Sequence, residues 1–474
     1  MIIGREKEQR ELLELLDKEE SQFCVVYGRR RVGKTFLIRE TFANRFAFQH
    51  TGLANASKND QLAQFKESLR AAGMKVHRKP KTWYEAFSLL QEHLSSLPTG
   101  KKVIFIDELS WLDTPKSNFV SALEHFWNGW ATARTEKDIV LIVCGSATSW
   151  LLNKIVQNHG GLHNRLTMKI HLQPFTLNEC RQYARHLRVD LSDIDILEAY
   201  MIMGGIPYYW SFMRLSESLA QNIDRIFFYN DAPLRDEYDA LYASLFKNAT
   251  PHIAIISALA KKKAGMLRDE ILLASHLSDN NVFSRALTEL EQCNFIRRYK
   301  AFGKKEKESL YQLMDNFTLF HFSFIANNQN NDVHLWSHSI DTPRHSTWAG
   351  QAFERTCFWH LPQMLNALGI SGIISSAHSW QIKGTEEHPG VQIDMLIDRN
   401  DNVINLCEMK FSSSDYVFNK DEDAKLRRRK TVFKAVTKTR KTVQLTLVTT
   451  YGLIRNAYSG NIQNIITMDD LFKQ

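Results

Sequence analysis

Apolar residues in the first third of the chain fall into short unbroken runs, and the stretches between the runs have helical spacing. The runs are residues 23–27, 103–107 and 139–144. Before the first run, residues 6–16 repeat apolar positions every three or four residues, which is typical of an amphipathic helix. Unbroken apolar strands that alternate with helices indicate a parallel sheet covered on both faces. The pattern therefore predicts an α/β domain over residues 1–172.

Helical spacing replaces the strand-like runs in the next part of the chain. Thr176 and Glu179 have the spacing of a capping box, so we expect a helix to begin there. Residues 173–240 are predicted to be all-helical, with an interruption at residues 204–207, which read Gly-Gly-Ile-Pro. This segment would form a helical unit beside the first domain.

Three segments complete the chain. The order helix, helix, helix, hairpin predicts a winged helix over residues 241–325, with a basic turn at residues 304–307. Residues 326–339 are polar and are predicted to be a linker. Residues 340–474 are predicted to form a separate α/β domain. Its expected strands are residues 391–397, 403–411 and 443–449.

A glycine-rich loop at residues 28–35 follows the first apolar run and fits the pattern G-x-x-x-x-G-K-[ST]. It lies between a strand and a helix, which is the context that a phosphate-binding loop requires. Lys34 would reach the β- and γ-phosphates, and Thr35 would offer its hydroxyl to Mg²⁺. The predicted nucleotide-binding residues of the loop are Gly28, Arg29, Arg30, Arg31, Val32, Gly33, Lys34 and Thr35. ATP and Mg²⁺ are therefore the expected cofactors.

Acidic and polar residues end the next two apolar runs. Asp107 is expected to hold Mg²⁺, and Glu108 to act as the catalytic residue that polarises the attacking water. Ser146 is placed either to sense the γ-phosphate or to cap the following helix. Arg165 is either an arginine finger or sensor at the nucleotide, or a surface arginine. With these residues, the phosphate loop is expected to hydrolyse ATP as well as bind it.

These motifs together resemble the archaeal and bacterial ATPases of the STAND class, which are related to AAA+ proteins. The resemblance rests on residues 3–6, 27–35, 107–108, 145–146 and 204–207. It implies that residues 173–240 are a helical lid, that Gly-Gly-Ile-Pro lies near the nucleotide, and that the Gly-Arg-Glu start lies near the adenine. The family usually has glycine before the arginine that corresponds to Arg165, whereas this chain has Asn164.

A second set of charged residues lies in the C-terminal domain. Glu408 and Lys410 are two positions apart on one expected strand, so they share a face, and Asp394 on the neighbouring strand can meet them. Two carboxylates suit Mg²⁺, and a nearby lysine can position a water or stabilise phosphate charge. The set resembles the PD-(D/E)XK nuclease fold, which is restriction-endonuclease-like. That resemblance adds Glu354 as the acid of the first helix, while Ile393 replaces the usual proline.

Composition modifies this picture only slightly. A net charge of +8 and an isoelectric point near 9.0 favour a polyanionic partner, and residues 425–441 are rich in lysine and arginine without Asp or Glu. DNA is the predicted partner, and a homo-oligomer or a partner protein stays an open alternative. The cysteines lack zinc-site or redox spacing, which fits a reduced cytoplasm. No apolar run reaches the ~18 residues of a membrane span, so no membrane contact is expected.

Two hypotheses remain at this stage. The first is an ATP-dependent switch that controls a Mg²⁺-dependent DNA nuclease domain; by family analogy, defence or mobile-element maintenance would suit it. The second is a regulatory ATPase whose end domain is catalytically inactive and serves as a DNA- or protein-binding scaffold. The acid set at Glu354, Asp394 and Glu408 favours the first hypothesis.

Overall fold

In this computed structural model the chain forms two compact units, Met1–Pro174 and Phe175–Gln474. The structure describes residues 1–157, 161–162, 164–246, 248–303, 308–382, 384 and 390–473. The basic turn expected at residues 304–307 lies outside the described residues. Among the helices that are described, none is long and apolar enough to cross a membrane.

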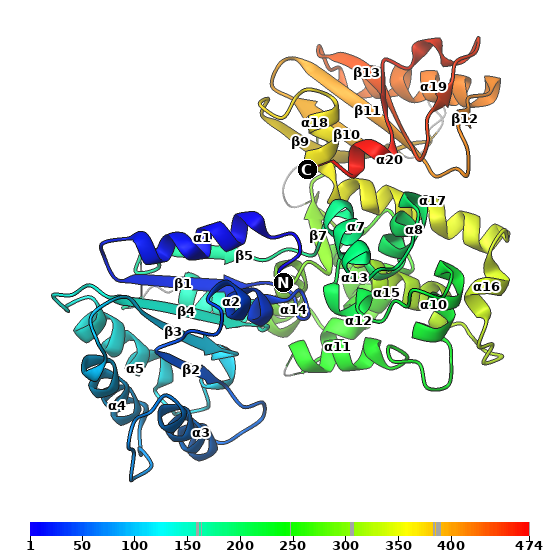
Figure 1. Cartoon of the computed structure of the whole chain (residues 1–474). Coiled ribbons are helices and arrows are strands. Elements are labelled where there is room, and N and C mark those ends of the chain that lie inside the picture. Colours follow the sequence, from blue (N-terminus) through cyan, green and yellow to red (C-terminus); the bar gives the residue numbers. More distant parts are fainter. Residues whose placement is uncertain are drawn as a thin grey trace. The chain divides into compact units, whose positions relative to one another are not determined.

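The first unit is built on a parallel five-stranded sheet with the strand order β2-β3-β4-β1-β5. Its strands are β1 (Gln22–Tyr27), β2 (Phe48–Thr51), β3 (Lys102–Asp107), β4 (Ile139–Gly145) and β5 (Met168–His171). Its α-helices are α1 (Glu6–Asp17), α2 (Lys34–Thr41), α3 (Lys58–Ala71), α4 (Trp83–Ser96), α5 (Phe119–Phe126) and α6 (Thr148–Leu151). Helices α1 and α2 lie on one face of the sheet, and α3, α4 and α5 lie on the other (Figure 1). The parallel pairing of these strands confirms the predicted α/β domain. Helices cover the sheet on both faces, as is usual for parallel sheets.

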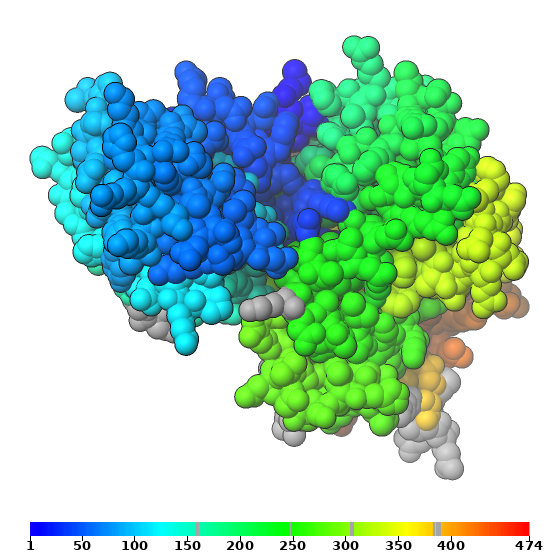
Figure 2. All heavy atoms as spheres, turned by 90° about the horizontal axis from the view of Figure 1, so that it is seen from below, coloured from blue at the N-terminus to red at the C-terminus, as the bar shows by residue number. Residues whose placement is uncertain are grey.

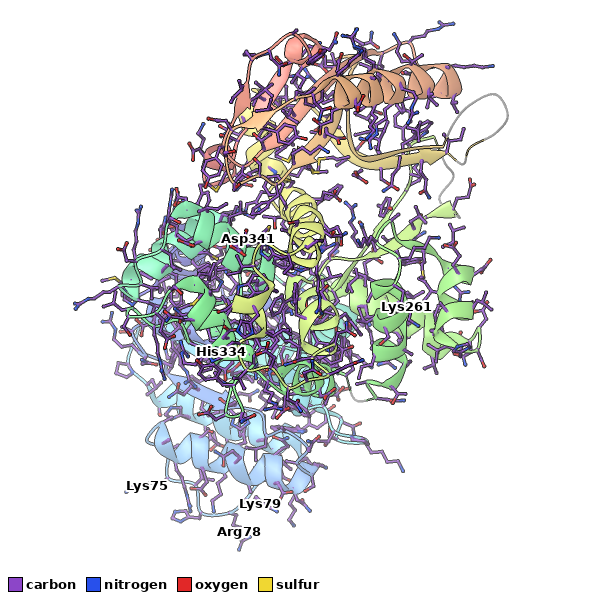
Figure 3. The ribbon with its side chains drawn as sticks, turned by 90° about the vertical axis from the view of Figure 1, so that its right-hand side faces the viewer. Lys75, Arg78, Lys79, Lys261, His334 and Asp341 are labelled. Atoms are coloured by element: carbon purple, nitrogen blue, oxygen red, sulfur yellow. The ribbon has the colours of Figure 1, made fainter. Side chains whose placement is uncertain are left out.

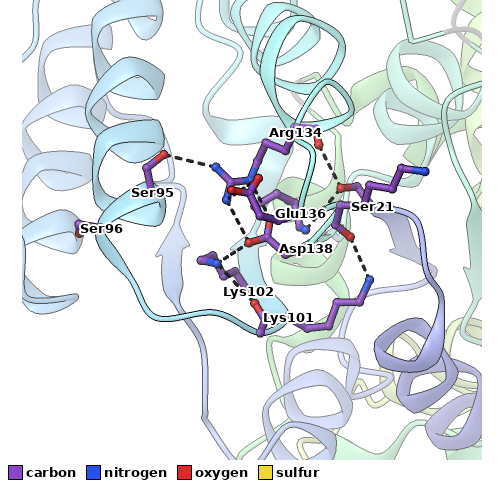
Figure 4. Close-up of polar contacts among 12 residues, drawn as sticks. Ser21, Ser95, Ser96, Lys101, Lys102, Arg134, Glu136 and Asp138 are labelled. Atoms are coloured by element: carbon purple, nitrogen blue, oxygen red, sulfur yellow. Dashed lines mark hydrogen bonds and ion pairs between the residues drawn. The ribbon is translucent and has the colours of Figure 1, made fainter.

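A buried ion network ties β3 to β4 at the amino ends of these strands (Figure 4). The carboxylate of Asp138 is contacted by the Lys102 ammonium and by Arg134, whose Nε lies 2.7 Å from Asp138 Oδ1. Burial acts to raise the pKa of Asp138, but hydrogen bonds from Arg134 and Lys102 hold it below the ordinary aspartate value. The network keeps two parallel strands in register at the end opposite the phosphate loop.

Replacing Asp138 with alanine is expected to lower the free energy of unfolding by about 3 kcal/mol, because two buried cations would lose their partner. Urea denaturation measures this loss, and the exposed Glu136→Ala is the matched control, expected to change stability by less than about 1 kcal/mol. Since the folded-state pKa of Asp138 is lowered, its contribution is present above the unfolded pKa of about 3.9 and disappears as the pH falls through the folded value. Equal stability of Asp138→Ala and the wild type at pH 7 would contradict this account.

The second unit begins with a helical segment. Its helices are α7 (Leu177–His186), α8 (Asp193–Met203), α9 (Pro207–Trp210), α10 (Leu219–Phe227) and α11 (Glu237–Leu245). Helix α7 starts with the capping box expected from Thr176 and Glu179. Helices α15 (Asn316–Phe320) and α16 (Leu335–Ser339) pack onto this segment. Trp336 of α16 is buried there, and its backbone N–H donates a hydrogen bond to the Asp224 carboxylate. Part of the stretch expected to be a linker is thus a packed helix, because Trp336 supplies an apolar anchor within a polar sequence.

A segment with the order of elements expected for a winged helix follows. It contains α12 (Thr250–Ala260), β6 (Met266–Leu267), α13 (Arg268–Ser275), α14 (Asn281–Gln292), β7 (Ile296–Tyr299) and β8 (Leu310–Leu313). The three strands pair antiparallel in the order β6-β8-β7. We call these elements the winged unit; in the space-filling view they have the green to yellow-green colours that the bar gives for their residues, and the helical segment before them is green as well (Figure 2).

The C-terminal domain is a mixed five-stranded sheet with the order β15-β13-β11-β10-β9. Its elements are α17 (Pro343–Trp359), α18 (Leu361–Ala367), β9 (Ser375–Ile382), β10 (Val391–Arg399), β11 (Val403–Lys410), β12 (Tyr416–Val417), α19 (Lys420–Thr437), β13 (Thr442–Thr449), β14 (Leu453–Ile454), β15 (Asn464–Ile466) and α20 (Met468–Leu471). Strand β10 pairs antiparallel with both β9 and β11, while β13 pairs parallel with both β11 and β15. Helix α19 packs on one face through Leu426 and Phe433, which join the apolar core of the sheet.

Candidate functional site

The phosphate loop joins the end of β1 to the start of α2. Gly28 has φ 143°, and a Cβ atom there would lie 2.3 Å from the carbonyl oxygen of Leu172, so only glycine fits. Gly33 has φ 91° directly before α2. Both motif glycines therefore occupy backbone conformations that other residues rarely adopt. Within the same loop, Arg29 and Val32 are buried, whereas Arg30 and Arg31 are half-buried.

The Lys34 side chain lies against its own loop. Its ammonium donates to the carbonyl oxygens of Gly28 and Arg29, both at 2.9 Å, and the residue is 6% exposed. The ammonium is thus held in the concavity where a phosphate would be expected. A stacked ring pair, Tyr27 and His171, lies at the ends of β1 and β5, with centroids 4.7 Å apart. Burial, followed by the Lys34 charge, lowers the pKa of His171, which places this ring beside the loop.

The residues predicted to hold Mg²⁺ in the first unit meet. Thr35 Oγ1 donates to Asp107 Oδ2 at 2.9 Å, although the two are far apart in sequence. A hydroxyl and a carboxylate are oxygen ligands of the kind that Mg²⁺ prefers. The other oxygen of Asp107 accepts from the Glu108 backbone N–H and from the Cys144 thiol, at 2.9 and 2.7 Å. Cys144 lies on β4 in an apolar run with no pattern that singles it out, and its thiol helps to hold the Asp107 carboxylate in place.

Glu108 and Ser146 form a direct contact at the carboxyl ends of β3 and β4. The backbone N–H and the hydroxyl of Ser146 both donate to Glu108 Oε2, at 3.2 and 3.0 Å. Glu108 itself has φ 49°, a left-handed conformation that is uncommon for glutamate. Two hydrogen bonds from one residue fix the carboxylate that was expected to polarise water.

Replacing Ser146 with alanine should lower kcat for ATP about tenfold, because Glu108 loses one of two orienting hydrogen bonds to a charged group. The KM should change by less than about threefold, since the phosphate loop is untouched. Ser146→Thr keeps a hydroxyl and should recover most of the rate. Steady-state kinetics measure both constants, and unchanged kcat in Ser146→Ala would show that the contact has no role in turnover.

Arg165 and Gly205 are two further residues expected near the nucleotide. Arg165 is exposed and follows Asn164, whose φ of 53° is tolerated by asparagine and glycine, so asparagine can replace glycine there. In the second unit, a Cβ at Gly205 would lie 1.9 Å from the carbonyl oxygen of Phe175, so Gly205 permits this close approach at the start of the helical segment. The expected approach of Arg165 and Gly205 to a nucleotide stays a prediction.

The four residues expected at the second site converge within the C-terminal domain. Glu354 lies on α17, Asp394 on β10, and Glu408 and Lys410 on β11. Lys410 Nζ lies 3.1 Å from Glu408 Oε1, and Asp394 Oδ1 accepts from the Gln392 side chain at 2.7 Å. Arg429 of α19 pairs with the other oxygen of Glu408. Sequence spacing could not indicate Arg429, because its approach depends on how α19 packs on the sheet.

The carboxylates of this second site influence one another. Burial raises the pKa of Glu354 to about 7, and the negative charges of Asp394 and Glu408 act in the same direction. We call Glu354, Asp394 and Glu408 the carboxylate cluster. In the part of the chain that the structure describes, no group of three or more His, Cys, Asp or Glu residues is arranged to hold a metal ion. The ligand pair predicted from Asp394 and Glu408 therefore stays a prediction, with Glu408 held by two cations in this structure.

Exposed basic residues lie on both units. On and after α19, the exposed basic residues are Lys420, Lys425, Arg427, Arg428, Lys434, Lys438 and Arg440. Arg427 is partly neutralised by Asp423 at 2.7 Å. In the first unit, Lys75, Arg78 and Lys79 extend from the segment between α3 and α4 (Figure 3). By contrast, Arg285 on the third helix of the winged unit pairs with Glu289 at 2.8 Å, which reduces its value for DNA contact.

Comparison with known proteins agrees with the geometry of the first unit. Residues 2–211 match the family described as an ATPase domain predominantly from Archaea. The uncharacterized protein MJECL04 of Methanocaldococcus jannaschii is 27% identical over 332 residues, which cover 69% of this chain and 70% of the relative. The Walker-type ATPase paby2304 of Pyrococcus abyssi shares the fold, with 18% identity, 67% of this chain and 95% of that chain covered, and a TM-score of 0.50.

A weaker structural similarity exists to a STAND protein with a tetratricopeptide repeat sensor, PH0952 from Pyrococcus horikoshii. It has 17% identity and a TM-score of 0.30, and covers 77% of this chain and 49% of that chain. The family match and the phosphate loop together show that the chain is a P-loop ATPase.

Proposed function

We propose that this P-loop ATPase uses ATP binding and hydrolysis to control a Mg²⁺-dependent site for phosphodiester cleavage in its C-terminal domain, with DNA as the substrate. The observation that carries the proposal is the convergence of Glu354, Asp394, Glu408 and Lys410 from three separate elements. Convergence of half-buried carboxylates that repel one another costs folding free energy, so such a cluster is a candidate functional site.

At the ATPase site, each residue has a defined task. Lys34 would bind the β- and γ-phosphates, and the loop N–H groups would surround them. Thr35 and Asp107 are adjacent at 2.9 Å and would hold Mg²⁺, which neutralises charge on the phosphates when bound. Glu108, held by Ser146, would accept a proton from the attacking water. Each oxygen ligand and each donor is on the same edge of the sheet.

At the C-terminal site, Asp394 and Glu408 would hold Mg²⁺, which stabilises charge on the phosphate when bound. Lys410 is next to Glu408 and can orient water or stabilise the leaving oxygen. The exposed cations of α19 suit a phosphate backbone, since binding there releases counterions. DNA contact along α19 would bring the scissile bond to the end of β11.

Cleavage of supercoiled plasmid in Mg²⁺ and ATP tests the proposal. Glu408→Gln keeps the size of the side chain and should reduce cleavage at least about tenfold, because a metal ligand loses its charge. Asp469→Asn, an exposed change in the same domain, should cut like the wild type. If Glu408→Gln cuts as fast as the wild type, any cleavage comes from elsewhere and the proposal fails.

A second candidate function rests on the ion pairs of Glu408. Arg429 and Lys410 already neutralise this carboxylate, as they would in an inactive domain that serves as a DNA- or protein-binding scaffold. That scaffold would bind DNA without cutting it. Gel-shift binding by wild type and Glu408→Gln, with no cleavage by either protein, is the result that selects this alternative.

A further inference from the structure

The winged unit contacts the outer strand of the C-terminal sheet. The Phe302 backbone N–H donates to the carbonyl oxygen of Ser379 on β9 at 3.0 Å. His378 Nδ1 of the same strand lies 3.0 Å from the carbonyl oxygen of Lys300. Strand β9 is at the edge of its sheet, where backbone groups are available for pairing. We call residues 296–302, which comprise β7 and the residues after it, the wing segment.

The ring of Phe302 anchors the wing segment. Its centroid lies 5.3 Å from that of Phe433 on α19 and 6.1 Å from that of His378 on β9. Phe302 also packs against the apolar cluster of the C-terminal domain, which includes Trp380 and Ile393. Because Ile393 directly precedes Asp394, the anchor ties the wing segment to the strand that carries a cluster carboxylate.

Two cations of the winged unit interact electrostatically with carboxylates of the cluster. The guanidinium carbon of Arg297 lies 3.5 Å from the ring centroid of Phe358 on α17, and its Nε donates to Gln312 at 2.7 Å. Burial lowers the pKa of Arg297 to about 10, while the charges of Tyr299 and Asp394 oppose that shift. Burial and the Arg355 charge lower the pKa of Lys263, which follows α12, while the charge of Glu354 opposes that shift. The winged unit thus adds positive charge opposite Asp394 and Glu354.

The combined charges explain why this arrangement would not favour a metal ion. Lys410 and Arg429 neutralise Glu408 from within the domain, and the charges of Arg297 and Lys263 act on Asp394 and Glu354 from the winged unit. A divalent cation would compete with these side chains for the carboxylates.

We propose that the wing segment is an internal inhibitor of the carboxylate cluster, held by Phe302 and compensating its charge through Arg297. This inference rests on the proposed cleavage function and names its regulation. Movement of the winged unit away from β9 removes Arg297 from Asp394 and opens the cluster to Mg²⁺ and nucleic acid. The ATPase is then coupled to cleavage through the release of this contact.

The test compares full-length wild type, Phe302→Ala and Arg297→Gln, with the exposed Leu273→Ala as the control in the same unit. Amide hydrogen exchange of residues 296–303 should be about tenfold faster in Phe302→Ala, because the anchor is lost. Calorimetric binding of Mn²⁺ to nucleotide-free protein should tighten at least about fivefold in Phe302→Ala and in Arg297→Gln, and this gain should vanish when Glu408→Gln is added. Plasmid cleavage should rise by a similar factor.

The outcomes separate the two proposals. Unchanged exchange in Phe302→Ala, or unchanged Mn²⁺ affinity in both variants, overturns the inhibitory contact. Cleavage by the wild type that neither variant accelerates overturns it as well. Tighter Mn²⁺ binding without cleavage by any of the proteins supports the inhibitory contact and overturns the cleavage function. If Phe302→Ala misfolds, Arg297→Gln alone decides, since it leaves the apolar anchor in place.

Discussion

Glu108→Gln is expected to bind ATP as tightly as the wild type and to hydrolyse it about 10²–10⁴ times more slowly. Glutamine keeps the size of the side chain and can still accept the hydrogen bonds of Ser146, so the geometry at the end of β3 should persist. It cannot take a proton from water. Single-turnover hydrolysis with labelled ATP measures the chemical step apart from product release.

Glu92→Gln on α4 is the matched control for this variant, because Glu92 is exposed and lies in the same unit. It should hydrolyse ATP at the wild-type rate. If Glu108→Gln hydrolyses ATP at the wild-type rate, Glu108 is not the catalytic residue and serves only as a hydrogen-bond partner of Ser146.

Lys34→Ala is expected to raise the Kd for ATP by about 30- to 5,000-fold, which corresponds to a loss of about 2–5 kcal/mol for one partner of a buried charge pair. The ammonium now donates to Gly28 and Arg29, and these contacts would be exchanged for phosphate oxygens when ATP binds. Fluorescence titration with a labelled nucleotide measures the affinity.

Lys75→Ala removes the same charge from an exposed position and should leave the Kd unchanged. A thermal melt should show that Lys34→Ala remains folded, since the carbonyl oxygens of its loop can be hydrated. Equal ATP affinity in Lys34→Ala and Lys75→Ala would mean that nucleotide binds elsewhere.

The sequence predicted the parts of the fold in which local pattern and burial agree. The apolar runs that became β1, β3 and β4 are buried along nearly their whole length, so they contain almost no polar residues. Strand β2 alternates buried and exposed positions over four residues, and β5 is a short edge strand, so neither produced a recognisable run. The wing segment also carried no sign of its contact with β9, because that contact depends on tertiary packing.

The candidate sites also contain residues that motif spacing predicted and residues that only tertiary packing reveals. Motif spacing predicted that Thr35 and Asp107 share a Mg²⁺ site, and they meet because the carboxyl ends of parallel strands lie at one edge of the sheet. The contact of Ser146 with Glu108 was not predicted. Cys144 and Arg429 were missed, since a lone cysteine in an apolar run and one arginine in a basic helix have no distinctive pattern. Their roles depend on which side chain faces them in the folded chain.

Nucleotide control of cleavage requires that the cutting rate depend on the nucleotide bound at the phosphate loop. Plasmid cleavage in Mg²⁺ is followed without nucleotide, with ATP and with a non-hydrolysable ATP analogue, for wild type and Lys34→Ala. Wild-type cleavage rates should differ by about tenfold or more between the nucleotide-free and ATP-bound protein, and Lys34→Ala should show no such difference. Equal wild-type rates under all three conditions would contradict nucleotide control.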